Sequence, residues 1–211
     1  ARDAAGGGRV AGAVGPIGAS YRPDLCPPVA DAVKLYEEPV RHLRDHVDLL
    51  AFETMASVEQ AEGALIAARA HSDLPVWLAL TVEDADGTRL RSGERLDRVA
   101  PLIERHQPAA VLVNCSPPEV IGDALEIVRG FGRPFGAYAN GFTRISAGFL
   151  QDASTVDALE SREDLDPAAY AEFAMGWVEQ GATIVGGCCE VGPAHIAELS
   201  RRLRAAGHDI V

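Results

Sequence analysis

The sequence predicts an α/β fold, a (β/α)8 TIM barrel of which six βα units are visible, and three observations support this. Short apolar runs alternate along the chain with amphipathic segments of helical period. Within the runs, apolar and polar residues do not alternate, as expected for strands of a parallel sheet that helices cover. Polar or unusual residues end nearly every run, where a barrel builds its active face.

Each predicted strand is a short apolar run followed by a helical pattern. In chain order the strands are Val10–Gly15, Leu49–Met55, Val76–Val82, Ala110–Ser116, Phe135–Asn140 and Thr183–Cys189. At or beside their carboxyl ends stand Gly15–Pro16, Glu53–Thr54, Thr81 and Glu83, Asn114–Cys115, Asn140, and Cys188–Cys189. Because these ends converge in a barrel, we expect their side chains to share one mouth.

The predicted helices lie near 29–46, 57–71, 92–107, 117–130, 167–180 and 193–206. Ser57 can cap the second helix, with Gln60 at the capping-box position. Prolines suit a first helical turn, and they open three of the later helices, at Pro118, Pro167 (after Asp166) and Pro193. Pro39 falls inside the first helix and is expected to kink or divide it.

A barrel of this kind needs eight units and typically about 250 residues, whereas the chain has 211 residues. Residues 1–5 resemble the end of a helix, so we expect two N-terminal βα units to be missing ahead of the first run. Six parallel strands would otherwise leave two open edges. We predict one domain, N-terminally incomplete, over residues 1–211. The stretch Gly141–Asp166 is a long insertion, typical of functional loops.

Composition narrows the class of partner. The formal net charge is −12 and the basic residues are scattered, so nucleic acid and anionic membranes are not expected. No run reaches the roughly 18–20 apolar residues of a membrane span, and the start does not resemble a signal peptide. We therefore expect a cytoplasmic protein, where clustered cysteines more often serve metal binding or catalysis than disulfides.

Three of the four cysteines end predicted strands: Cys115, Cys188 and Cys189. Neighbouring residues on a regular strand point to opposite faces, so Cys188 and Cys189 can share an ion only beyond the strand, which Gly186 and Gly187 allow. Three thiolates suit Zn²⁺ and leave a fourth tetrahedral position open, as in catalytic zinc sites. Two alternatives remain: these cysteines are buried core residues, or the glycine pair binds a phosphate.

Five motifs carry a family resemblance. They are Val-Gly-Pro-Ile-Gly-Ala at 14–19, Phe-Glu-Thr-Met at 52–55, Asn-Cys-Ser at 114–116, Tyr-Ala-Asn-Gly at 138–141, and Gly-Gly-Cys-Cys at 186–189 with Pro-Ala-His-Ile at 193–196. In this order, from about Val10 to Leu203, they resemble the homocysteine S-methyltransferase family. The resemblance implies a (β/α)8 barrel with Cys115, Cys188 and Cys189 as zinc ligands, and Glu53 as the carboxylate that holds the substrate's amino group.

The sequence also departs from the family pattern. Glu190, Val191 and Gly192 follow the paired cysteines where Arg-Thr-Thr is usual, and Ala139 replaces a usual proline. The family's two opening motifs have no counterpart. These differences bear on the thiol acceptor and the methyl donor more than on the zinc site.

The resemblance implies a zinc-dependent methyltransferase of the EC 2.1.1 class. It would move a methyl group from an onium donor, with S-methylmethionine favoured, to the thiol of homocysteine or a similar thiol, giving methionine in methionine biosynthesis. Its partners would be these small molecules, and a homo-oligomer is compatible with the sequence. Asn114 and Asn140 are candidate hydrogen-bond donors to the substrate. The alternatives are a catalytically inactive zinc-binding scaffold or regulatory subunit, and a thiol–disulfide protein that uses Cys188 and Cys189.

Four other residues carry weaker functional signals. His42 and His46 have helical metal-binding spacing, but no third ligand accompanies them, which favours a solvated helix face. Cys26 is expected in a loop or in packing. Tyr138 either lines the site or fills the barrel.

Overall fold

The computed structural model describes residues 8–151 and 156–211. Residues 1–7, which include the expected end of a helix, lie outside this part. One parallel sheet runs in chain order from β1 to β6. Its strands are β1 (Ala11–Val14), β2 (Leu49–Met55), β3 (Val76–Leu80), β4 (Ala110–Asn114), β5 (Phe135–Tyr138) and β6 (Ile184–Val185). All six lie within the predicted runs, and β6 is much shorter than its run.

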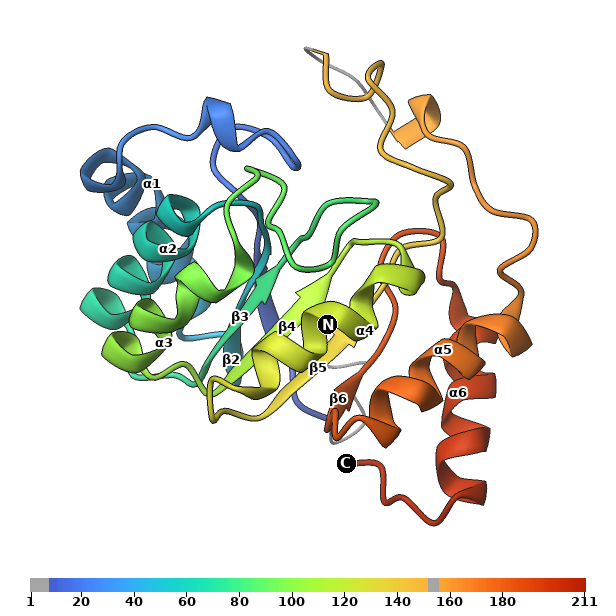
Figure 1. Cartoon of the computed structure of the whole chain (residues 1–211). Helices are drawn as coiled ribbons and strands as arrows, with labels where there is room; N and C mark the ends of the chain where they lie inside the picture. Colours follow the sequence, from blue (N-terminus) through green and yellow to red (C-terminus); the bar gives the residue numbers. More distant parts are fainter. Residues whose placement is uncertain (1–7, 152–155) are drawn as a thin grey trace.

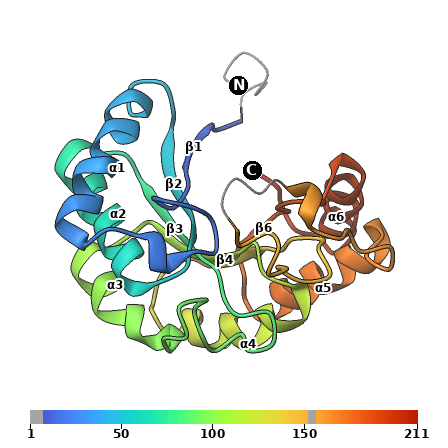
Figure 2. The same cartoon turned by 90° about the horizontal axis from the view of Figure 1, so that it is seen from above.

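Helices alternate with these strands and lie on the outer face of the sheet (Figure 1). They are α1 (Val29–Leu43), α2 (Val58–His71), α3 (Ala100–His106), α4 (Pro118–Arg129), α5 (Pro167–Glu179) and α6 (Pro193–Ala205). Seen from above, the sheet curves into an arc with the helices outside and an opening between β1 and β6 (Figure 2). The predicted α/β arrangement of six βα units is therefore confirmed.

Apolar side chains are buried on both faces of the sheet. The larger cluster fills the space between strands and helices and includes fully buried Leu50, Phe52 and Leu78. The smaller cluster lies on the inner face, where Ala79, Ala110 and Leu112 are joined by partly buried residues, namely Trp77, Tyr138 and Ile184. This two-sided burial explains why the strand sequences do not alternate.

The predicted capping box at the start of α2 forms only in part. Ser57 caps α2 by accepting a hydrogen bond from Gln60 N at 3.1 Å. The Gln60 side chain, however, accepts from Ala56 N at 2.8 Å and does not complete the capping box on Ser57.

Pro39, which we expect to kink or divide the first helix, does not divide it, because α1 runs unbroken through Pro39. Proline removes one donor, to the carbonyl four residues earlier. That residue, Leu35, is 51% exposed, so the missing hydrogen bond falls on the solvent side of the helix. The flanking Tyr36 and Val40 are fully buried and hold the helix against the core.

The third unit starts its helix later than the predicted 92–107. Antiparallel bridges join Val82 to Leu90 and Arg89 to Arg95, which holds this stretch in a folded loop. A 3-10 turn over Leu96–Val99 then leads into α3.

The insertion after β5 is closed at its base by a group of contacts that we call the clasp. Phe142 and Ser161 form an antiparallel bridge, and Arg162 N donates to Gly141 O at 2.8 Å. The Arg162 side chain also pairs with Glu119 of α4 at 2.6 Å. The clasp therefore fixes both ends of the insertion beside the end of β5.

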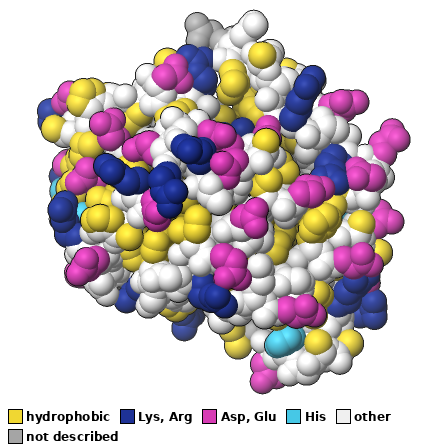
Figure 3. Space-filling view, in the orientation of Figure 1, with side chains coloured by type: hydrophobic (Ala, Val, Ile, Leu, Met, Phe, Trp, Pro, Cys, Tyr) yellow, Lys and Arg dark blue, Asp and Glu magenta, His cyan; other side chains and the backbone are white. Residues whose placement is uncertain are grey.

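The surface carries charged side chains of both signs. On the face shown in Figure 3, lysine and arginine side chains are interspersed with aspartate and glutamate. Among the described residues, no helix has the length and apolar character needed to cross a membrane.

Candidate metal centre

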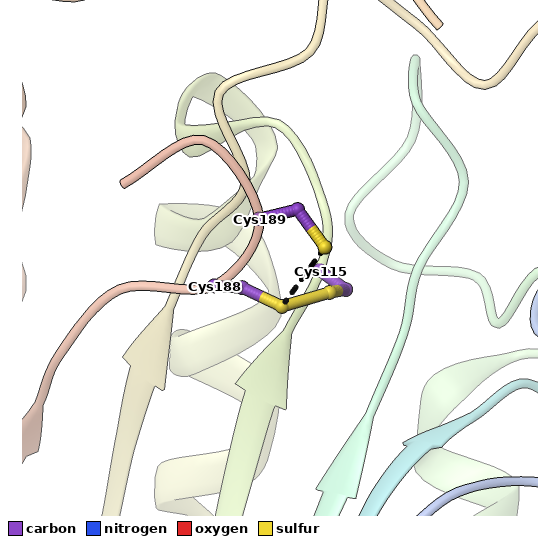
Figure 4. Close-up of side chains that lie close together, drawn as sticks. All are labelled: Cys115, Cys188 and Cys189. Atoms are coloured by element: carbon purple, nitrogen blue, oxygen red, sulfur yellow. Dashed lines mark hydrogen bonds between the residues drawn. A yellow bond between two sulfur atoms is a disulfide. The ribbon is translucent and has the colours of Figure 1, made fainter. Parts of the chain in front are cut away.

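Three cysteine sulfurs meet above the carboxyl ends of the strands (Figure 4). Cys115 follows directly after β4, and Cys188 and Cys189 lie beyond the end of β6. The three Sγ atoms lie within 4.8 Å of one another, although 73 residues separate Cys115 from Cys188. The structure brings these three residues together at one mouth, as predicted.

Two of these sulfurs are joined. Cys115 and Cys188 form a disulfide with their Cα atoms 5.7 Å apart, and the Cys189 sulfur is free and lies 4.0 Å from that of Cys188. The thiol–disulfide alternative named a different pair, Cys188 with Cys189. Reduction of this disulfide by two electrons and two protons gives two thiols, which together with Cys189 make three thiols at one place.

The reduced residues would fit a metal ion. Tetrahedral zinc with bonds of about 2.3 Å places sulfur ligands roughly 3.8 Å apart. Because the three sulfurs already lie within 4.8 Å of one another, shifts of about an ångström or two would give that spacing. A set of three soft thiolates favours zinc among common ions and leaves one coordination position open.

Cys188 and Cys189 lie together because the chain leaves regular strand geometry before them. Strand β6 ends at Val185, yet Cys188 N still donates to Ala139 O at 2.9 Å and Gly141 N donates to Cys189 O at 2.8 Å. A Cβ on Gly187 would lie 2.1 Å from Val191 Cγ1, so only glycine fits there. The expectation that the paired cysteines lie beyond the strand is confirmed.

The end of β4 is held far more firmly. Cys115 is 4% exposed and has a φ of +47°, which is uncommon for a residue other than glycine. Its backbone N donates to Tyr138 O at 3.1 Å. Asn114 accepts from Thr54 N at 2.9 Å and donates to Thr54 Oγ1 at 3.0 Å, so its amide ties β4 to the end of β2.

Glu53 lies on the inner side of the arc, half-buried, at the carboxyl end of β2. Its Oε1 accepts a hydrogen bond of 2.9 Å from the Tyr138 hydroxyl. Burial, reinforced by the Glu53 charge, raises the pKa of Tyr138 well above its ordinary value. Burial also raises the pKa of the free Cys189 thiol, and the nearby carboxylates of Glu190 and Glu53 add to this shift.

Asn140 has an unused donor. Its Oδ1 accepts from Phe142 N at 3.3 Å, while Nδ2 is buried and has no hydrogen-bond partner among the described residues. The residue is 1% exposed. An orphan buried donor costs free energy unless a ligand or water accepts from it.

Three residues near the mouth come from loops and were not singled out in the sequence. Burial and the charge of Cys189 together raise the pKa of Tyr21 to about 12, while Arg91 and the Asn140 side chain oppose the rise, so Tyr21 lies near Cys189 and Asn140. The Arg91 guanidinium lies over the Tyr21 ring, 4.8 Å from its centre, and pairs with Asp84. Asp84 also accepts from Ile145 N at 2.9 Å, so these contacts link three loops.

The remaining sequence candidates lie outside the cysteine group. His42 Nδ1 is 2.8 Å from Glu38 O on its own exposed helix face. His195 lies at the start of α6, where it accepts from Gly192 N, and its other ring nitrogen contacts Leu165 O just before α5. In the described ranges, the three cysteines form the one cluster of side chains that could hold a metal ion.

Comparisons with known proteins agree with this geometry. A profile of the homocysteine S-methyltransferase family matches residues 1–203. Homocysteine S-methyltransferase of Escherichia coli is 33% identical over 206 residues, which are 92% of this chain and 62% of that protein. Homocysteine S-methyltransferase 1 of Arabidopsis thaliana is 29% identical over 163 residues, or 74% of this chain and 46% of that protein.

A solved structure is also similar. The metallated form of the homocysteine methyltransferase MmuM from Escherichia coli superposes with a TM-score of 0.73 at 28% identity, covering 95% of this chain and 63% of that one. The chain thus spans about half to two thirds of the length of the relatives it matches.

Proposed function

This chain belongs to the homocysteine S-methyltransferase family, and from that premise we propose that it transfers a methyl group from an onium donor to the thiol of homocysteine or a similar thiol. The product with homocysteine is methionine. The observation that carries the proposal is the meeting of Cys115, Cys188 and Cys189 within 4.8 Å at the mouth. Once reduced, these residues would hold a zinc ion.

A zinc ion bound there supplies a Lewis acid that favours the thiolate form of an added sulfur ligand at neutral pH. An ordinary alkyl thiol has a pKa near 8.5 and is mostly protonated at that pH. Only the thiolate is a good nucleophile for a methyl carbon.

The protein's own side chains would orient the thiol. In this proposal, the Glu53 carboxylate pairs with the substrate ammonium, and the orphan Nδ2 of Asn140 donates to the substrate. Asn114 acts indirectly, because Thr54 already engages its amide and the Asn114–Thr54 pair holds the end of β2 that carries Glu53. Holding two reactants in line is worth several kcal/mol of barrier.

The charge around the cysteines favours a cationic donor. Glu53 and Glu190 both act on Cys189 as negative charges. Arg91, which lies over the Tyr21 ring, is paired with the Asp84 carboxylate. A sulfonium such as S-methylmethionine is attracted to such a mouth, whereas an anionic folate is repelled. We therefore favour S-methylmethionine. Because the site needs reduced thiols, we propose that the reaction takes place in the cytoplasm, as a step of methionine biosynthesis.

The test uses full-length protein purified with a thiol-free reductant. We expect about one zinc per chain by elemental analysis, and methionine from homocysteine plus S-methylmethionine, with less or none from betaine or methyltetrahydrofolate. Stoichiometric zinc without turnover on any donor would favour the zinc-binding scaffold instead. Absence of zinc after full reduction would contradict the proposal itself.

A further inference from the structure

We infer that Tyr138 is a positioning residue: its hydroxyl occupies one oxygen of the Glu53 carboxylate and so presents the other to the ammonium group of the thiol substrate. The inference rests on the proposed function, and specifically on the amino-acid nature of the acceptor. It adds a residue whose side chain would not itself touch the reacting atoms.

The contact joins strands that are not neighbours. Glu53 belongs to β2 and Tyr138 to β5, with β3 and β4 between them in the sheet. The hydroxyl nevertheless lies 2.9 Å from Glu53 Oε1. The hydrogen bond therefore spans the inner side of the arc, just below the cysteines that follow β4 and β6.

The tyrosine is well placed to hold this geometry. Its ring packs in the inner apolar cluster beside Leu112 and Ile184, so the ring has little freedom to move. Its backbone carbonyl accepts from Cys115 N at 3.1 Å. The same residue thus joins the substrate-binding carboxylate to the segment that carries the buried cysteine.

The carboxylate has one oxygen left for a ligand. Within the described ranges, the Tyr138 hydroxyl is the one hydrogen-bond donor found for Glu53, and it binds Oε1. A hydroxyl bonded to a carboxylate is a charge-assisted, directional contact, which restricts rotation of the acid group. Oε2 is then free to pair with an ammonium, and its direction is set before the substrate arrives.

A purely structural role for Tyr138 predicts something different. If the tyrosine only fills the barrel, then losing its hydroxyl affects all thiols alike. If it orients Glu53, the loss affects only thiols that carry an α-ammonium. The decisive comparison is homocysteine against 4-mercaptobutyrate, which has the same thiol and carboxylate but no amino group.

The experiment measures binding of both thiols to the reduced, zinc-loaded protein by calorimetry, and KM and kcat where turnover occurs. For Tyr138→Phe, which keeps the ring, we expect homocysteine to bind roughly 10-fold more weakly. KM should rise by a similar factor with kcat nearly unchanged, and 4-mercaptobutyrate should bind the variant and the parent equally. Glu53→Gln should show the same selective loss.

Tyr36→Phe is the matched control. Tyr36 is a fully buried tyrosine whose hydroxyl bonds to Ile17 N and Met55 Sδ, behind the sheet. It should leave the binding of both thiols unchanged.

Equal losses for the two thiols in Tyr138→Phe, or no loss for either, would overturn this inference and leave the proposed function intact. If the parent protein holds zinc but binds neither thiol, both the inference and the proposed function fail. The parent's affinities therefore separate the two kinds of failure.

Discussion

The two sides of the cysteine group differ in how firmly the fold holds them. Cys115 is 4% exposed and follows β4, whose five residues are all buried. Cys188 and Cys189 are partly exposed and follow β6, which has two residues, neither of them buried. One cysteine is thus fixed by the core, while the other two lie on a segment held mainly by a few backbone hydrogen bonds to the end of β5 and the residues after it.

This difference indicates that different interactions hold the two sides in position. The β2–β4 region sets the position of Cys115 and Glu53 whether or not a metal is present. The β6 segment has little apolar burial of its own, so ligands that join it to β4 should supply much of its local stability. The following experiments test this contrast, from the largest expected effect to the smallest.

Replacing one cysteine on the weaker side should remove the site. For Cys188→Ser we expect loss of bound zinc and a fall in methyl transfer beyond the roughly 10- to 100-fold typical of losing an outer-shell partner. Elemental analysis and a methionine assay measure the two effects. Cys26→Ser is the control, since Cys26 lies in a separate loop and packs against the core. Retention of one zinc per chain in Cys188→Ser would show that the segment does not hold the ion.

Core truncations should reveal the unequal stability directly. Leu78 in β3 is fully buried, so Leu78→Ala should cost about 2–5 kcal/mol of unfolding free energy. Val185→Ala in the half-exposed β6 should cost about 1 kcal/mol or less. Urea unfolding of the reduced, metal-free proteins gives both values. Similar costs at the two positions would refute the contrast.

Bound zinc should slow amide hydrogen exchange in the β6 segment more than in β2 and β3. At a free zinc concentration about 100 times the dissociation constant, opening of the site becomes about 100-fold rarer. We expect amides of residues 183–189 to exchange with deuterium correspondingly more slowly, with little change in β2 and β3. Hydrogen exchange read by mass spectrometry measures this. Uniform protection across the sheet would mean that the metal stabilises the whole fold and not the β6 segment.

The smallest effect concerns a surface ion pair of the C-terminal helix. Hydrogen bonds from Arg201 and Arg202 lower the pKa of Glu198 to about 2 from an ordinary 4.5. Because the folded-state pKa lies below the unfolded one, the stabilisation is present above pH 4.5 and is lost as the pH falls toward 2. Glu198→Gln should therefore lower the melting temperature slightly at pH 6, and this difference should shrink in acid. A difference in melting temperature between the metal-free parent and Glu198→Gln that does not change with pH would contradict this assignment.

Residues that form regular elements were predictable from the sequence. The strands are apolar on both faces, and Ser57 caps its helix as predicted. Asp166 followed by Pro167 opens α5 as predicted, and the structure adds that Ala169 N donates to Asp166 Oδ1 at 2.8 Å. The meeting of Cys115 with Cys188 followed from the convergence of strand ends in a barrel. The shortness of β6 could have been read from Gly186 and Gly187, which have no side chains to pack.

Contacts between loops could not be predicted. Tyr21, Arg91 and Asp84 meet only because three connections fold over one mouth, and no spacing along the chain indicates this. The pairing of Cys115 with Cys188 likewise depends on which sulfurs the backbone brings nearest. Pro39 shows a related limit, since the burial of Tyr36 and Val40 outweighs a missing hydrogen bond.

The clasp at the base of the insertion has a consequence for how this scaffold can diversify. Phe142 with Ser161 and Arg162 with Gly141 fasten the two ends of the loop next to Asn140 and Cys189. Exchanges within residues 144–159 that keep the contacts of Ile145 with Asp84 and of Phe149 with Tyr21 should therefore leave Asn140 and Cys189 in place. Evolution or engineering can thus alter this loop while the residues at its base stay where the clasp holds them.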